Sequence, residues 1–171
     1  SGIEINTDGG NDTYLQVADG GAVLGGLNQM TLEVQFSSTD IPNNLLVTSL
    51  VGYTTASDGD EMFLALHNNG GTMQIVLQIQ GAWSPVGAIS TADIYDGAMH
   101  SIAATWDGVT GTWQAYFDGQ FVGGASGYPT TAFDGASGNL VFGSDPDVGS
   151  DTYAMDSDHT FSGTFYDVRV W

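Results

Sequence analysis

HSIAATWDGVTGTWQAYFDGQ, residues 100–120, is the stretch that decides the fold class of this 171-residue chain. From His100 to Trp106 apolar and polar residues alternate, which is the period of a half-buried β-strand. The segment Trp106–Trp113 predicts a hairpin with a longer loop. Asp118-Gly119 favours a two-residue hairpin turn, because both residue types readily adopt positive φ. The stretch therefore predicts consecutive antiparallel strands.

The rest of the chain has the same character. Residues 30–36 alternate strictly, and residues 45–51 and 72–79 are more continuous apolar runs that are typical of strands buried in a sandwich. No segment is typical of a helix, and 25 glycines separate the short apolar runs. About a dozen strands at this spacing predict a two-sheet antiparallel sandwich in a single domain over residues 1–171.

The charge balance is strongly acidic. Twenty acidic residues, seventeen of them Asp, stand against Arg169 alone, for a net charge of −19. Nucleic acid is excluded as a partner, because phosphate contacts need Lys and Arg, and no apolar run is long enough for membrane insertion. The absence of cysteine excludes a disulfide framework and thiolate metal sites. An acidic surface suited to salty surroundings and dedicated cation sites both explain the charge, although the preference for Asp favours cation-binding loops.

Two long segments lack an alternating pattern, residues 125–138 and residues 144–160. Long loops in a compact domain are usually functional, and the second segment is rich in Asp. Asp145 and Asp147 are spaced two apart, as are Asp58 and Asp60, so each pair can converge in a loop. Calcium takes six to eight oxygen ligands, and two such pairs with Asp156 or Asp158 would supply them. The alternative is that these aspartates are scattered loop caps that face solvent.

The order of motifs resembles that of pentraxins and laminin-G-like domains. The resemblance rests on residues 99–119, on the strand 139–143, on the closing segment 161–171 and on the opening segment 11–17. It implies a concanavalin A-like jelly roll with a calcium-dependent ligand face. It also implies three groups of calcium ligands, which fall on Asp58 and Asp60, on Asp145 and Asp147, and around Asp156 to His159. The chain departs from pentraxins in having no cysteine pair and a longer loop after Asp147.

Aromatic and histidine residues are the candidates for ligand contact. Trp83 lies in a turn-rich segment where a sugar ring could stack on it, and Tyr153 in the acidic loop is a second candidate. Loop anchoring is the alternative for both. His159 adjoins the acidic loop and is a candidate for orienting a ligand. His100 is expected in the core, and Trp106, Trp113 and Trp171 are expected to be structural.

These observations favour an extracellular or cell-surface lectin module that uses Ca²⁺ to bind glycans. It is similar to the lectin modules of large multidomain bacterial adhesins. A calcium-stabilised peptide-binding module or spacer remains the alternative. A glycoside hydrolase is less favoured, because such enzymes need two carboxyl groups flanking the scissile bond. The E-x-D-x-E pattern of glucanases is absent, and Glu61 is the only Glu near the acidic loops.

Overall fold

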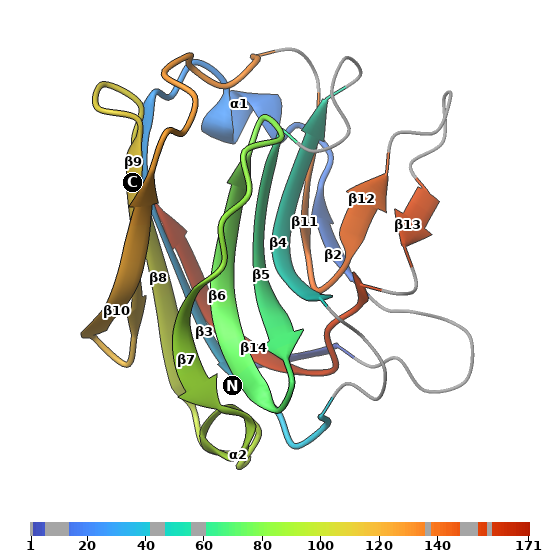
Figure 1. The fold of residues 1–171 in the computed structure, drawn as a ribbon. Helices are drawn as coiled ribbons and strands as arrows, with labels where there is room; N and C mark the ends of the chain where they lie inside the picture. Colours follow the sequence, from blue (N-terminus) through green and yellow to red (C-terminus); the bar gives the residue numbers. More distant parts are fainter. Residues whose placement is uncertain are drawn as a thin grey trace.

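Two antiparallel six-stranded sheets face each other in this computed structural model (Figure 1). The structure describes residues 2–5, 14–41, 47–55, 61–135, 138–147, 154–156 and 159–171, with backbone alone at residues 147 and 154–156. The prediction of an all-β, two-sheet jelly-roll sandwich is confirmed.

Sheet A contains residues 100–120, the stretch that predicted consecutive antiparallel strands. Its strands lie in the spatial order β1 (Ile3–Ile5), β14 (Gly163–Val170), β3 (Gln29–Ser37), β8 (His100–Asp107), β9 (Thr112–Phe117) and β10 (Gln120–Ser126). β8, β9 and β10 follow one another along the chain as the predicted hairpins. Asp118 and Gly119 join β9 to β10 with φ values of 46° and 74°, which confirms the predicted two-residue turn.

Sheet B lies opposite and is also built from neighbouring hairpins. Its strands lie in the order β2 (Leu15–Val17), β11 (Gly138–Phe142), β4 (Val47–Thr55), β5 (Met62–Asn69), β6 (Thr72–Ile79) and β7 (Val86–Ser90). β2 falls inside the predicted opening strand, of which residues 11–13 lie outside the described residues. The predicted interval without strand character between Ala125 and Gly138 is close to the observed one, because β10 ends at Ser126.

A third, two-stranded sheet overturns the expectation that residues 144–160 lack strands. β12 (Asp145–Asp147) and β13 (Ala154–Asp156) pair antiparallel beside β4 and β11 (Figure 1). The helices α1 (Gly21–Leu24) and α2 (Thr91–Ile94) are each a single turn. Apolar alternation could not predict β12, because the position of this strand depends on its contact with β4.

The core fills the space between the two sheets. Along β3 the even-numbered residues 30–36 are buried and the odd-numbered ones are partly exposed, as the alternation predicts. Trp106 and Trp113 are buried in the core, as expected. Trp171 is not, since 63% of its surface is exposed. It follows β14, and its backbone pairs with Thr31, so it occupies the outer side of sheet A.

His100 is largely buried, as expected, but its contacts are polar as well as apolar. Its ring stacks on Phe117, with centroids 5.1 Å apart. Its Nδ1 lies 2.9 Å from Asp118 Oδ2, and its Nε2 lies 3.1 Å from Asp96 Oδ1. His100 thus links the loop before β8 to the β9–β10 turn.

Candidate functional site

The strand β12 is held against β4 by two contacts. Ser49 Oγ donates a hydrogen bond of 2.9 Å to the carbonyl oxygen of Ser144, just before β12. Farther along both strands, a Cβ at Gly52 would lie 2.5 Å from Cδ of Pro146, so only glycine allows this approach. β12 therefore runs alongside β4 in the same direction, toward the end of β4.

This direction matters for the predicted calcium ligands. β4 ends at Thr55, and the segment that follows it in the sequence contains Asp58 and Asp60, which lie outside the described residues. Asp147 is the last residue of β12 and is therefore nearer to the end of β4 than Asp145 is. The topology directs the Asp145–Asp147 segment toward the end of β4, after which the other pair follows in the sequence.

The register of β12 and β13 brings two predicted ligands together. Asp145 lies directly opposite Asp156, and Asp147 lies opposite Ala154. Directly opposed Cα atoms in an antiparallel pair are only about 4.5–5.5 Å apart. The strand pair therefore places two aspartates opposite each other, although they are eleven positions apart in the sequence.

Asp145 also meets His159. The side chain of Asp145 is 11% exposed, and its Oδ2 lies 3.1 Å from Nδ1 of His159. The His159 ring in turn lies 6.3 Å from that of Phe63 on β5. His159 therefore connects the aspartate pair to the outer face of sheet B.

The remaining predicted ligands are only partly described. Asp58, Asp60, Tyr153 and Asp158 lie outside the described residues, and the side chains of Asp147 and Asp156 are not described. Within the described part of the chain, no group of three or more His, Cys, Asp or Glu side chains forms a metal site. Of the six aspartates predicted as ligands, Asp145 alone has a described side chain.

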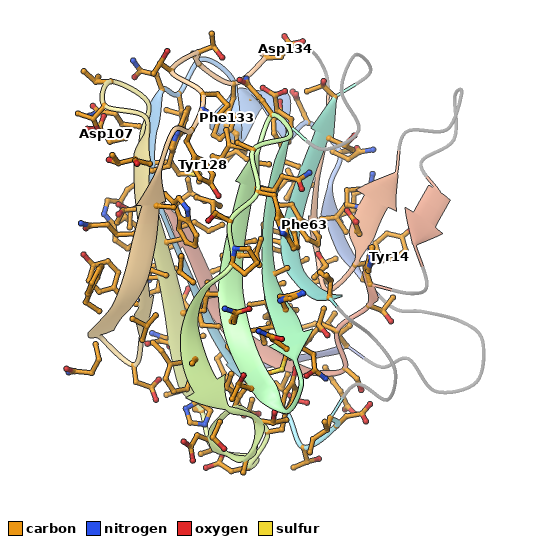
Figure 2. All side chains as sticks on the ribbon, in the orientation of Figure 1. Tyr14, Phe63, Asp107, Tyr128, Phe133 and Asp134 are labelled. Atoms are coloured by element: carbon orange, nitrogen blue, oxygen red, sulfur yellow. The ribbon has the colours of Figure 1, made fainter. Side chains whose placement is uncertain are left out.

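A strip along β5 connects this region to Trp83. Leu64 and Leu66 belong to the core, so Phe63, Ala65 and His67 point to the other face of the strand. Phe63 and His67 are four residues apart, which corresponds to about 13 Å of extended strand. Figure 2 labels Phe63 within sheet B, on the side of the molecule away from Asp107.

Trp83 lies at the His67 end of the strip, in the segment between β6 and β7. Its ring meets the His67 ring edge-on, with centroids 6.0 Å apart, and 40% of the residue remains exposed. His67 Nδ1 lies 3.2 Å from Oε1 of Gln74 on the neighbouring strand. Trp83 is therefore held by its edge and leaves indole surface accessible to a ligand.

Glu61 occupies a structural position. It is 3% exposed, and its Oε1 accepts hydrogen bonds from Gln80 Nε2 at 2.9 Å and from the backbone N–H of Asp134 at 2.7 Å. This carboxyl group ties the start of β5 to two loops, and its oxygen is already engaged.

Sequence reasoning missed the contacts of Phe63 and His67. The signal was present, because Phe63, Ala65 and His67 are spaced two apart in a strand. Neither the approach of His159 nor that of Trp83 could be predicted, since both depend on how loops fold back over the sheet.

The family model described as the concanavalin A-like lectin/glucanases superfamily matches residues 8–171, which is nearly the whole chain. The chain belongs to this superfamily. A curated relative is the mouse sushi, von Willebrand factor type A, EGF and pentraxin domain-containing protein 1, which is 27% identical over 149 residues. That match covers 87% of this chain and 4% of the mouse protein, so the chain corresponds to a small part of its relative.

Solved structures confirm the superfamily fold. A heptameric SAP-like pentraxin from Limulus polyphemus superimposes with a TM-score of 0.78 at 16% identity, covering 99% of this chain and 75% of the pentraxin. The CBM40 of the Ruminococcus gnavus IT-sialidase superimposes with a TM-score of 0.69 at 16% identity, covering 99% and 88% of the two chains. The predicted resemblance to pentraxins is confirmed at the level of fold.

Neither of the one-turn helices, nor any other helix within the described ranges, is long and apolar enough to cross a membrane.

Proposed function

We propose that this domain is an extracellular carbohydrate-binding module that uses calcium to bind glycans, within a larger adhesive protein. The observation that carries the proposal is the cross-strand pairing of Asp145 with Asp156 beside His159. Membership of a lectin and glucanase superfamily supports carbohydrate binding in general. The sialidase CBM40 has been solved with sialyllactose bound, which supports a glycan ligand for this fold.

The donor set fits calcium. Calcium prefers carboxylate and carbonyl oxygens over nitrogen or sulfur, and the predicted ligands Asp58, Asp60, Asp145, Asp147, Asp156 and Asp158 are all aspartates. Two carboxylates about 4 Å apart repel each other by about 4 kcal/mol at an effective dielectric of 20. A cation would relieve that repulsion. The chain's one basic side chain, Arg169, forms an ion pair with Asp167 on β14 of the other sheet.

The ligand would meet both the cation and the exposed ring of Trp83. A calcium ion held by carboxylates from separate segments keeps positions for sugar hydroxyls. His159 would orient the ligand beside the ion, and Trp83 would stack on a ring farther along the strip, with Tyr153 as a further contact. Phe63 and Ala65 between these two contacts are buried, with 4% and 0% of their surfaces exposed, so the glycan would contact the cation and Trp83 rather than β5 itself.

Binding without catalysis is the simplest reading of the carboxyl groups. A glycosidase needs a general acid and a second carboxylate on either side of the scissile bond. Glu61, the glutamate nearest to these loops in the sequence, is buried and accepts two hydrogen bonds. We therefore propose that the module positions a glycan without cleaving it.

A glycan array probed with and without calcium tests this function. The proposal predicts a set of glycans that bind in calcium but not in chelator, and loss of binding to that set in Asp145→Asn while the domain stays folded. Binding of no glycan in calcium would favour the peptide-binding or spacer alternative. If glycan binding beside Asp145 and Trp83 survives chelation, any bound calcium has only a structural role.

A further inference from the structure

The outer face of sheet A carries a second polar surface that the calcium site does not use. Trp171 and Thr31 exchange backbone hydrogen bonds of 3.1 and 2.7 Å, so they are directly opposed and share a face. Thr31 lies opposite Thr105, and Thr105 lies opposite Gln114. These four side chains therefore form one row across β14, β3, β8 and β9, spanning about 14 Å.

The row lines a trough of about 520 Å³, which we call the sheet-A trough. Between Trp171 and Gln114 the row has only the short side chains of Thr31 and Thr105, which form the floor of the trough. Trp171, 63% exposed, forms one end. The volume falls within the range of known ligand sites. The principal contacts of α1 and α2 are with β11 and β7, so neither helix covers this face.

Neighbouring residues orient the polar groups of the trough. Tyr116 Oη donates a hydrogen bond of 2.9 Å to Gln114 Oε1, which leaves the Gln114 amide N–H groups as donors. Gln29 Nε2 donates to Asp107 Oδ1 at 2.9 Å, which leaves Gln29 Oε1 as an acceptor. The trough thus presents oriented donors and acceptors beside an exposed indole.

The charge of the trough selects among ligands. Among the residues that the structure describes, Asp107 is the one ionisable side chain that lines the trough, and its oxygens already accept hydrogen bonds from Gln29, Val109 and Thr110. An anionic ligand would be repelled by this carboxylate and by the net charge of −19. An unbranched apolar ligand would leave the amides and hydroxyls without partners. A neutral sugar satisfies both conditions, because it has a C–H face for the indole and hydroxyls for the amides.

We propose that the sheet-A trough binds a neutral oligosaccharide without calcium. This site is separate from the proposed calcium site, because Asp107 and Phe63 belong to different sheets and lie on different sides of the sandwich (Figure 2). A module with both sites would contact two glycan segments at once.

Affinity electrophoresis in chelator tests the trough. Native gels would contain galactomannan, xyloglucan or mixed-linkage β-glucan as neutral probes, and polygalacturonate as the anionic comparison. The domain is expected to be retarded by at least one neutral polysaccharide and not by polygalacturonate. Trp171→Ala and Gln114→Ala are each expected to weaken binding by about tenfold, the order of a lost aromatic or hydrogen-bonding contact.

Two variants serve as matched controls. Val109→Ala removes an exposed side chain next to the trough that does not line it, and Asp145→Asn disables the proposed calcium site; both are expected to bind as the wild type does. If no neutral polysaccharide retards the domain in chelator, the proposal that the trough binds a neutral oligosaccharide is wrong, even if calcium-dependent binding occurs elsewhere. Equal retardation of Trp171→Ala, Gln114→Ala and the wild type would overturn it as well.

Discussion

Asp145 on β12 lies directly opposite Asp156 on β13, and the carboxylate of Asp145 is 3.1 Å from the ring of His159. In the sequence these two aspartates belong to a long acidic segment without an alternating pattern. In the fold they face each other across the β12–β13 pair, beside sheet B. The proposed function depends on this relationship, and several predictions test its parts.

Gly52 is predicted to set the position of β12. Gly52→Ala places a Cβ 2.5 Å from Cδ of Pro146, so β12 must shift, at a cost of about 1–3 kcal/mol of stability. The calcium-induced rise in Tm is expected to shrink as well, because Asp145 moves with Pro146. Gly135→Ala is the control, since its Cβ would have its nearest neighbour at 3.8 Å. A normal calcium response in Gly52→Ala would show that the β4 contact does not position the site.

Trp83 is predicted to contact the glycan but not the metal. Trp83→Ala is expected to weaken calcium-dependent glycan binding by about 1 kcal/mol, on the scale of aromatic contacts, and to leave calcium affinity unchanged. Isothermal titration with glycan and with calcium separates the two effects. Phe121→Ala removes an exposed aromatic side chain from the other sheet that does not line the sheet-A trough, and is expected to leave this binding intact. If Trp83→Ala also binds glycan normally, Trp83 serves only to anchor its loop.

His100 is predicted to make stability depend on pH. Burial lowers the pKa of His100, but hydrogen bonds to Asp118 and Asp96 outweigh burial and raise the pKa overall. The pKa of Asp96 is lowered by the backbone N–H of Ala98 and by His100. The His100 contribution is therefore complete below its unfolded pKa of about 6.5 and is lost as pH rises through the higher folded value. The Asp96 contribution is present above about pH 4 and is lost as pH falls through the lowered value.

Urea unfolding at about pH 5.5 and about pH 8 measures the His100 effect, since it brackets the ordinary histidine pKa. The wild type is expected to lose more stability between these two values than His100→Gln does. The same loss in both proteins would assign the pH dependence to other groups.

The domain is predicted to leave polysaccharides intact. The engaged carboxyl group of Glu61 provides no accessible general acid. Pure protein is therefore expected to release no reducing ends from neutral or acidic glycans. Release that disappears in Glu61→Gln would identify a hydrolase instead.

Local patterns predicted the strands but not the contacts between distant segments. The alternation at residues 30–36 and the Asp118-Gly119 turn depend on nearest neighbours, so the sequence was sufficient for both. β12 depends on Pro146 fitting against Gly52, a contact across more than ninety positions. Trp171 was expected to be structural, like Trp106 and Trp113, but it is 63% exposed, because its strand pattern does not reveal which sheet face it occupies.

In the candidate site, too, the residues were predicted from the sequence but the contacts between distant segments were not. The sequence identified Asp145 and Asp156 as related residues, but their register comes from the β12–β13 pairing. The contacts of His159 with Phe63 and of Trp83 with His67 come from loops that return to the sheet, and no local pattern encodes that return.

Calorimetric titration of calcium into chelator-stripped protein tests the central claim most directly. The wild type is predicted to bind at least one calcium ion, with a dissociation constant of about 0.1–1 mM as in extracellular calcium modules. At 100 times that constant, calcium should add about 2.7 kcal/mol to the free energy of unfolding. Asp145→Asn is predicted to lose this binding while keeping its fold. Equal calcium binding by the wild type and Asp145→Asn, or none by either, would contradict the account.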